Sequence, residues 1–267
     1  MDIFQGAILG IVEGLTEFLP ISSSGHLILA RELLGINISS GLATDAVLQL
    51  ASVLAVGVYF FRDLWNILIT GIRIVFRKHV EEKAGILFWA VIFGTIPGVI
   101  LGLLLESYMQ TVFRSAFLVA CTLALGSLLF FLAEKLAKQD KILSKIRGFW
   151  VGCFQALALV PGISRSGATI SGGLMLGLTR EEAARFSFVL SFPIILGSGL
   201  KKLLDLWSDP QVSQIETPLI VGSILAFSVG LACIHFLIRY LRTHSLNVFA
   251  YYRLALSLVV FLILFVR

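Results

Sequence analysis

Charged side chains are scarce in this chain of 267 residues. Only 14% of the residues are Asp, Glu, Lys or Arg, whereas soluble globular domains carry roughly 25%. Hydrophobic residues make up 58% of the chain, and the mean hydropathy is +0.96. This composition excludes an ordinary soluble domain and predicts an integral membrane protein.

Cysteine is also rare. Cys121, Cys153 and Cys233 are odd in number, lie in apolar segments and lack the spacing of metal ligands, which excludes a disulfide framework or a zinc site. We interpret them as packing residues. The N-terminus has Asp2 and no basic residue before its short apolar run, so we expect no secretory signal peptide.

The net charge of +5 does not indicate a nucleic-acid partner, because no RNA- or DNA-binding pattern accompanies it. In so apolar a chain the excess is typical of basic cytoplasmic loops.

Six segments approach the roughly 20 apolar residues that a spanning helix needs. They are Ala46 to Phe61, Ile86 to Leu105, Ser115 to Ala133, Phe186 to Leu200, Thr217 to Ile238 and Leu246 to Val266. Two further apolar regions, Ile3 to Leu29 and Gly148 to Leu178, are interrupted by polar clusters. Non-helical backbone at membrane depth is tolerated where it is buried in protein or lines a cavity, so we predict two re-entrant helix, loop, helix hairpins.

Basic residues gather in three connections that this topology places on one side. These are Arg62 to Lys83, Glu134 to Arg147, and the segment with Arg239 and Arg242. The positive-inside rule assigns that side to the cytoplasm. The opposite loops, Glu106 to Thr111 and Asp205 to Glu216, carry more acid than base. The first hairpin should therefore open to the outside and the second to the inside.

The chain also shows a faint internal repeat. An offset of 142 residues, from Ser22 to Ser164, aligns Gly10 with Gly152 and Gly25 with Gly167. Each half then contains one hairpin and three spans, and an odd number of spans inverts the second copy. We predict a single all-α membrane domain over 1–267, with two inverted-topology repeats at about 1–137 and 148–267.

The first polar cluster contains a pair of carboxylates. Glu13 and Glu17 are four residues apart and share one face of a helix. Two carboxylates in an apolar hairpin repel each other unless a cation bridges them or one is protonated. Mg²⁺ or Ca²⁺ would suit these oxygens and a substrate phosphate. The alternative is that one glutamate faces outer water and the other bonds the broken turn.

Hydroxyls and a histidine follow. Ser22, Ser23, Ser24 and Gly25 come directly after a proline and lead into a second half-helix starting near His26, and a helix start of this kind binds anions. Serine runs are also ordinary helix caps. His26 is able to act as acid, base or nucleophile, or it serves only as a hydrogen-bonding residue.

The second cluster centres on Arg165. Its guanidinium matches phosphate oxygens, and Ser164, Ser166 and Thr169 flank it. Two roles fit Arg165. It binds a phosphate opposite the first hairpin, or it forms an internal salt bridge with Glu17 or Glu13, and the protein can use the two in turn.

Arg253 is the weaker candidate. We expect it to be structural, snorkelling from the last span to the cytoplasmic interface.

Together these residues favour phosphoryl transfer or hydrolysis over two other classes. A transporter of a phosphorylated lipid would share the inverted repeat, but it has no need of a carboxylate pair, a serine and a histidine together. A structural protein leaves both polar clusters unexplained.

Residues 13–26, Glu-Gly-Leu-Thr-Glu-Phe-Leu-Pro-Ile-Ser-Ser-Ser-Gly-His, and residues 161–169, Pro-Gly-Ile-Ser-Arg-Ser-Gly-Ala-Thr, closely resemble the signatures of the undecaprenyl-diphosphate phosphatases, or bacitracin-resistance proteins. The resemblance implies hydrolysis of undecaprenyl diphosphate in the bacterial inner membrane, a divalent cation, and a site that faces the outer side. Ser24 stands where relatives often have threonine, and both residues carry a hydroxyl.

The resemblance also assigns roles to residues. It implies that Glu13 and Glu17 hold the metal, and it implies catalytic roles for Glu17, Ser23, His26 and Arg165. The substrate-binding residues would be Ser22, Ser24, Gly25, Ser164, Ser166, Gly167 and Thr169.

In the mechanism that we predict, Ser23 attacks, His26 relays a proton and Arg165 holds the diphosphate, with direct attack by water as the rival. The implied partners are the polyprenyl diphosphate lipid and membrane lipid, and a homodimer is left open.

Overall fold

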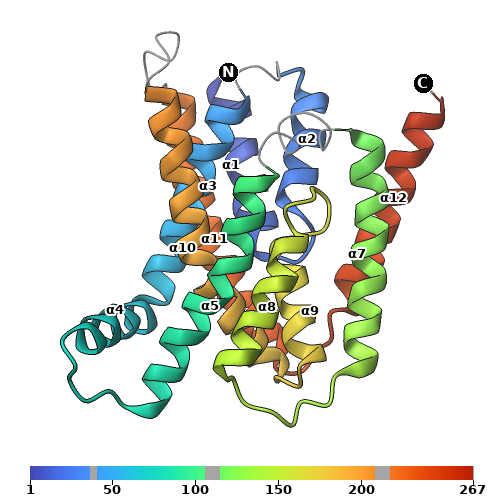
Figure 1. The fold of residues 1–267 in the computed structure, drawn as a ribbon. Helices are drawn as coiled ribbons and strands as arrows, with labels where there is room; N and C mark the ends of the chain where they lie inside the picture. Colours follow the sequence, from blue (N-terminus) through green and yellow to red (C-terminus); the bar gives the residue numbers. More distant parts are fainter. Residues whose placement is uncertain (37–40, 106–114, 208–216, 267) are drawn as a thin grey trace.

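The chain folds entirely into helices over the residues that the computed structural model describes, which are 1–36, 41–105, 115–207 and 217–266 (Figure 1). The helices are α1 (Ile3–Phe18), α2 (Ser23–Leu34), α3 (Gly41–Tyr59), α4 (Phe61–Val75), α5 (Glu82–Leu104), α7 (Ala116–Leu136), α8 (Lys145–Leu157), α9 (Arg165–Met175), α10 (Arg180–Trp207), α11 (Thr217–Leu241) and α12 (Asn247–Val266). The predicted all-α class is confirmed for this part of the chain.

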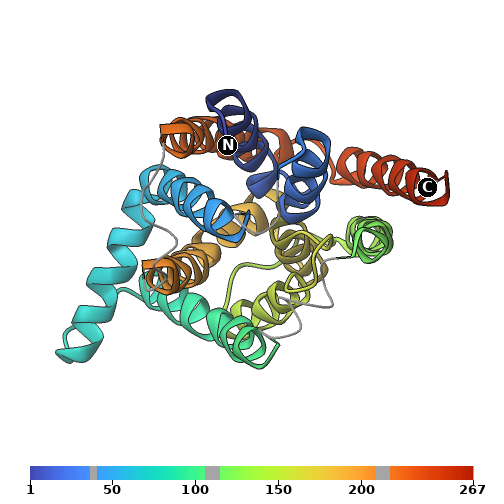
Figure 2. The ribbon, with the colours of Figure 1, turned by 90° about the horizontal axis from the view of Figure 1, so that it is seen from above.

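Five of the described helices, α5, α7, α10, α11 and α12, are long and apolar enough to cross a membrane. A sixth crossing is obtained if α3 and α4, which are bent by 83° at their junction, count as one span. Each of the six predicted spans falls on one of these helices, and the chain is a multi-pass membrane protein. Seen from above, the C-terminal half of α12 extends away from the other helices beside α7 (Figure 2).

Both predicted helix breaks are present. The first separates α1 from α2, and the second separates α8 from α9. In Figure 1, α1 and α2 have their outer ends at the top, whereas α8 and α9 have theirs at the bottom, so the two breaks approach each other from opposite ends of the molecule.

The two breaks share an uncommon backbone geometry. Ser22 and Ser164 immediately precede α2 and α9, with φ of 78° and 74°. Positive φ is uncommon for a residue with a side chain and is often associated with a functional site. The two serines are the pair that the repeat aligns.

The first hairpin extends further than predicted. Helix α2 begins at Ser23 rather than near His26, and it continues past Leu29 to Leu34 before Gly35 ends it with a φ of 64°. The guanidinium of Arg31, in the last turn of α2, pairs with Asp45 of α3. A long-range ion pair therefore keeps the last turn of α2 in the fold.

Helices α1 and α11 pack backbone against backbone. A Cβ added at Gly10 would overlap the carbonyl oxygen of Gly222. Small residues allow such close approach between membrane helices, where van der Waals packing drives association. Gly152 of α8 meets Gly94 of α5 in the same way, so both broken-helix pairs are anchored by glycine contacts.

We predict that Gly10→Ala lowers the free energy of unfolding by about 1 to 3 kcal/mol, because α1 and α11 must separate to admit the methyl group. Thermal unfolding in detergent measures the change. Gly197→Ala is the matched control, since a Cβ there meets nothing within 4 Å. Equal melting temperatures for the two variants would contradict this packing.

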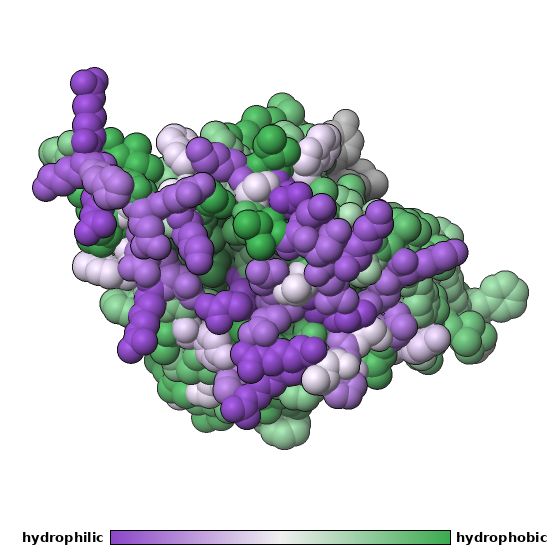
Figure 3. Space-filling model, turned by 90° about the horizontal axis from the view of Figure 1, so that it is seen from below, coloured by the Kyte–Doolittle hydropathy of each residue, from purple (hydrophilic) through white to green (hydrophobic). Residues whose placement is uncertain are grey.

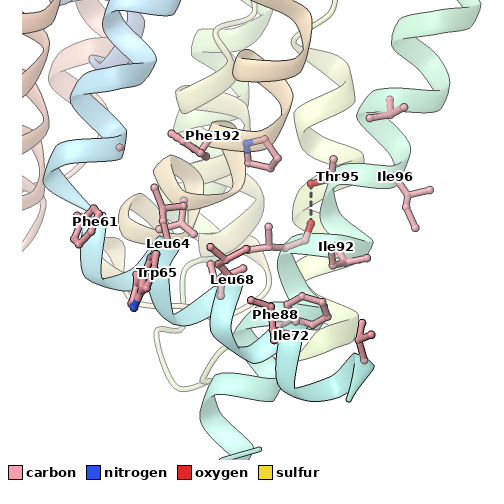
Figure 4. A pocket seen from close by; sticks show the side chains of 18 of the residues that line it. Phe61, Leu64, Trp65, Leu68, Ile72, Phe88, Ile92, Thr95, Ile96 and Phe192 are labelled. Carbon is pink, nitrogen blue, oxygen red and sulfur yellow. Dashed lines mark hydrogen bonds between the residues drawn. The ribbon is translucent and has the colours of Figure 1, made fainter. Parts of the chain in front are cut away.

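The prediction that Arg62 to Lys83 forms a loop is wrong, because residues 62–75 belong to helix α4. Basic residues suggested a loop, but apolar residues recur at helical spacing and give α4 one apolar face. Figure 4 shows Leu64, Leu68 and Ile72 of this face near Ile92 of α5. They line an apolar groove of about 1370 Å³ between α3, α4, α5 and α10, so α4 has the amphipathic character of an interfacial membrane helix.

Hydrophilic side chains cover much of the face opposite the N-terminus (Figure 3). The connections from α4 to α5, α7 to α8 and α11 to α12 lie at this end (Figure 1), and they carry the basic residues on which the predicted orientation depends. The acidic loops predicted at the other end lie outside the described residues, apart from the last turn of α10.

Candidate active site

The two helix breaks meet inside the protein. Arg165, at the start of α9, pairs with Glu17 of α1, with 3.4 Å between Nη2 and Oε1. Ser166 donates a hydrogen bond to the backbone carbonyl of Leu19 at 3.4 Å. The structure thus brings the two predicted clusters together, and the internal salt bridge considered from the sequence is present.

Glu17 links the guanidinium to a serine. Its side chain is buried, and Oε2 accepts a hydrogen bond from the hydroxyl of Ser23 at 2.6 Å. Hydrogen bonds to an ionised carboxylate are short and strong. A hydroxyl this close to a carboxylate has a base within reach of its proton, which is the arrangement of an activated nucleophile.

Glu13 lies one helical turn before Glu17 and has no such partners. Its side chain is 0% exposed. Oε1 accepts only a long hydrogen bond from Ser52 of α3 at 3.5 Å, and Oε2 has no partner among the described residues. A buried carboxylate oxygen without a partner carries a high desolvation cost. This orphaned oxygen fits a bound cation.

The donor set around such a cation would be small. Among the residues described, no group of three or more Asp, Glu, His or Cys side chains is placed to hold a metal. Glu13 and Glu17 would supply two carboxylates, and the remaining ligands would come from water and phosphate oxygens, as is usual for Mg²⁺.

Arg165 is held from one side and free on another. Nη1 donates to the backbone carbonyl of Ser187 in α10 at 3.4 Å. Nε is buried and has no partner in the described structure. An unpartnered N-H of a guanidinium can donate to a phosphate oxygen, so Arg165 retains a donor for an anion.

The predicted substrate-binding hydroxyls fall into two matching pairs. Ser22 and Ser24 are 3.4 Å apart between their hydroxyl oxygens, and Ser164 and Ser166 are 3.3 Å apart. Each pair stands at a helix start, where backbone N-H groups are available to an anion.

Three other predicted binding residues are already engaged. Thr169 shares a 2.5 Å hydrogen bond with the hydroxyl of Ser187. Gly25 packs near Val119 of α7, and a Cβ at Gly167 would overlap the ring of Phe130. Their observed contacts therefore fix the positions of α2 and α9.

His26 is not hydrogen-bonded to Ser23 or Glu17 in the described structure. Its Nδ1 lies 2.8 Å from the backbone carbonyl of Ser22, and its Nε2 lies 2.8 Å from the hydroxyl of Tyr252 in α12. The base within reach of the Ser23 hydroxyl is the Glu17 carboxylate.

Arg253 occupies the centre of the protein, and the prediction that it snorkels to the interface is wrong. It is 0% exposed. Its guanidinium donates to the carbonyls of Gly162 and Ile163 at 2.8 Å each and to that of Pro20 at 3.3 Å. Helix breaks leave backbone carbonyls without intrahelical partners, and one guanidinium has five N-H donors to satisfy them.

Four residues of this region were not found from the sequence. Ser52 is the one serine of α3, Ser187 is one of three serines in α10, and Tyr252 is one tyrosine among many aromatic residues. The fourth, Ser257, donates to the carbonyl of Ala120 and connects α12 to α7. A single polar residue in a long apolar helix was the available signal, but it does not say which partner it reaches.

Fold and site together define a class: a helical membrane protein whose polar centre is assembled from two broken-helix pairs, with a carboxylate and serine from one and an arginine from the other. The chain belongs to the bacitracin resistance protein BacA family, whose model matches residues 6–259.

Several curated relatives are similar over nearly the whole chain. A protein of Thermobifida fusca is 41% identical over 267 residues, covering 97% of this chain and 89% of its own length. One of Corynebacterium efficiens is 43% identical, covering 97% and 90%, and one of Chloroherpeton thalassium is 42% identical, covering 96% and 95%. All three are named undecaprenyl-diphosphatase. The resemblance found in the two motifs is thereby confirmed.

Proposed function

We propose that this chain hydrolyses undecaprenyl diphosphate to undecaprenyl phosphate and inorganic phosphate, the reaction for which its relatives are named. The observation that carries the proposal is the continuous array of Ser23, Glu17 and Arg165 across the two breaks. The reaction recycles the lipid carrier of peptidoglycan synthesis, and resistance to bacitracin is a property of the family.

The geometry supports a two-step route. Glu17 takes the proton of Ser23 as its oxygen attacks the terminal phosphorus, and the bond to the bridging oxygen breaks to release undecaprenyl phosphate. Water then attacks the phosphorus of the phosphoserine, the bond to the serine oxygen breaks to free phosphate, and Glu17 returns its proton to that oxygen. Arg165 binds the phosphoryl oxygens, whose negative charge it stabilises in both steps.

Glu13, with its unpartnered oxygen, is the main candidate to hold a divalent cation, and Glu17 contributes as its neighbour. When bound, Mg²⁺ or Ca²⁺ supplies positive charge against the diphosphate oxygens. In the structure Glu17 already bonds Ser23 and Arg165. We therefore separate the two carboxylates, with Glu13 serving the cation and Glu17 serving the nucleophile.

We further propose that the broken pairs are re-entrant hairpins of two inverted repeats, with the site open to the outer face of the bacterial inner membrane. Three observations support this arrangement. The two pairs enter from opposite ends of the molecule, Ser22 and Ser164 have similar positive φ angles, and each break carries a matching pair of serine hydroxyls. The basic connections at the opposite end favour the cytoplasm there.

The test is phosphate release from undecaprenyl diphosphate by the purified protein in detergent. We expect release by the wild type, a loss of about 100-fold or more with EDTA, and recovery with Mg²⁺ or Ca²⁺. Arg165→Ala should lower release by about 100-fold, because a preorganised donor to the phosphoryl oxygens is removed. Arg239→Ala, at an exposed position on α11, should retain wild-type activity.

No release from folded wild-type protein would overturn the proposal, and transfer of the lipid across vesicles would then favour a transporter. Full activity of Arg165→Ala would leave the hydrolase proposal standing but would contradict the role of Arg165 in binding the phosphate.

A further inference from the structure

Tyr252 and His26 form a hydrogen-bonded pair from opposite ends of the sequence. The hydroxyl of Tyr252 lies 2.8 Å from Nε2 of His26. The two rings stack, with centroids 5.7 Å apart and planes inclined by 10°. Helix α12 therefore reaches the first helix break through a side chain that neither motif contains.

The partners of the imidazole determine its tautomer. A backbone carbonyl only accepts hydrogen bonds. The contact of Nδ1 with the carbonyl of Ser22 at 2.8 Å consequently places the proton on Nδ1. In the neutral ring Nε2 is then an acceptor, and the hydroxyl of Tyr252 is its donor.

Tyr252 is itself rigidly placed. The next residue, Arg253, is bonded to carbonyls of both helix breaks. Ser257, further along α12, donates to the carbonyl of Ala120 in α7 at 2.7 Å. Two contacts on the C-terminal side of Tyr252 in α12 thus restrict its motion relative to the first break.

We propose that Tyr252 is a positioning residue of the hydrolase. Its hydroxyl holds the ring of His26 in one orientation, with Nδ1 protonated and donating to the carbonyl of Ser22 and with Nε2 accepting from Tyr252. In many functional sites, a group hydrogen-bonded to the second ring nitrogen of a histidine fixes its tautomer and ring orientation. The expected change in kcat rests on the proposed hydrolysis, whereas the expected orientation and tautomer of His26 do not.

The test is Tyr252→Phe, which keeps the aromatic ring and removes only the hydroxyl. We expect kcat for phosphate release to fall about 10-fold with KM within about 2-fold, because His26 is less well oriented toward the carbonyl of Ser22, the residue directly before the Ser23 nucleophile, while the phosphate contacts of Arg165 are unchanged. Tyr251→Phe is the matched control: it is the neighbouring tyrosine on the same helix, and its ring packs against Phe131. Its kcat should equal that of the wild type.

A second readout is independent of activity. ¹⁵N NMR of histidine-labelled protein in detergent should show His26, assigned through His26→Gln, as the single Nδ1-H tautomer in the wild type and in Tyr251→Phe. Tyr252→Phe should shift it to a tautomer mixture. An unchanged tautomer, or a raised KM at unchanged kcat, would overturn the positioning role. If the wild type released no phosphate but Tyr252→Phe still shifted the tautomer of His26, the proposed function would be contradicted and the positioning of His26 by Tyr252 would stand.

Discussion

Ser23→Ala is expected to lower kcat for phosphate release by at least about 10³-fold, an effect of the size seen when a nucleophile is deleted. The hydroxyl of Ser23 is 2.6 Å from the carboxylate of Glu17, whose other oxygen is paired with Arg165. Without the hydroxyl this carboxylate has no nucleophile of the protein to deprotonate. The folded structure should survive, because alanine is well tolerated at the first position of a helix.

Ser228→Ala is the control for this substitution. Ser228 is exposed on α11 and donates to the carbonyl of Ile224 in its own helix at 2.8 Å, so wild-type kcat is expected. Acid-quenched reactions with labelled substrate should contain phosphoprotein for the wild type and none for Ser23→Ala. A loss of less than about 10-fold, with no phosphoprotein in the wild type, would favour direct attack by water.

Residues inside the two motifs could be predicted because each carries a local signal. A proline or glycine breaks the helix, and ionisable residues in an apolar segment are too costly to lack a function. The pairing of Arg165 with Glu17 followed from this reasoning, since a buried guanidinium needs an anion. The apolar helices themselves could be predicted for the same reason, because hydropathy is a property of each segment by itself, and five of the six predicted spans fall on described helices that are long and apolar enough to cross a membrane.

The partners supplied by other helices could not be predicted. Tyr252 lies 226 residues from His26, and Ser187 lies 22 residues from Arg165, and no spacing rule connects such positions. The position of Arg253 was mistaken, although its structural role was expected, because its partners are backbone carbonyls, which every residue has. Helix α4 was mistaken because its basic residues outweighed its apolar periodicity.

Arg253→Met is expected to prevent stable folding. The change removes the donors to the carbonyls of Pro20, Gly162 and Ile163 and leaves these groups buried without partners. Each such group costs about 1 to 3 kcal/mol, and three of them approach the whole stability of a typical domain, about 5 to 15 kcal/mol. Thermal unfolding and gel filtration in detergent should show loss of the monodisperse protein.

Arg253→Lys separates the charge from the geometry. An ammonium keeps the positive charge but has three donors and no planar fork, so it satisfies the carbonyls of only one break at a time. We expect a folded protein whose kcat falls about 10-fold or more, because Ser23 and Arg165 are held by different breaks and must remain in register. Arg239→Lys, at the exposed end of α11, should match the wild type. Wild-type kcat in Arg253→Lys would mean that the contacts of Arg165 with Glu17 and of Ser166 with Leu19 suffice to keep the two breaks aligned.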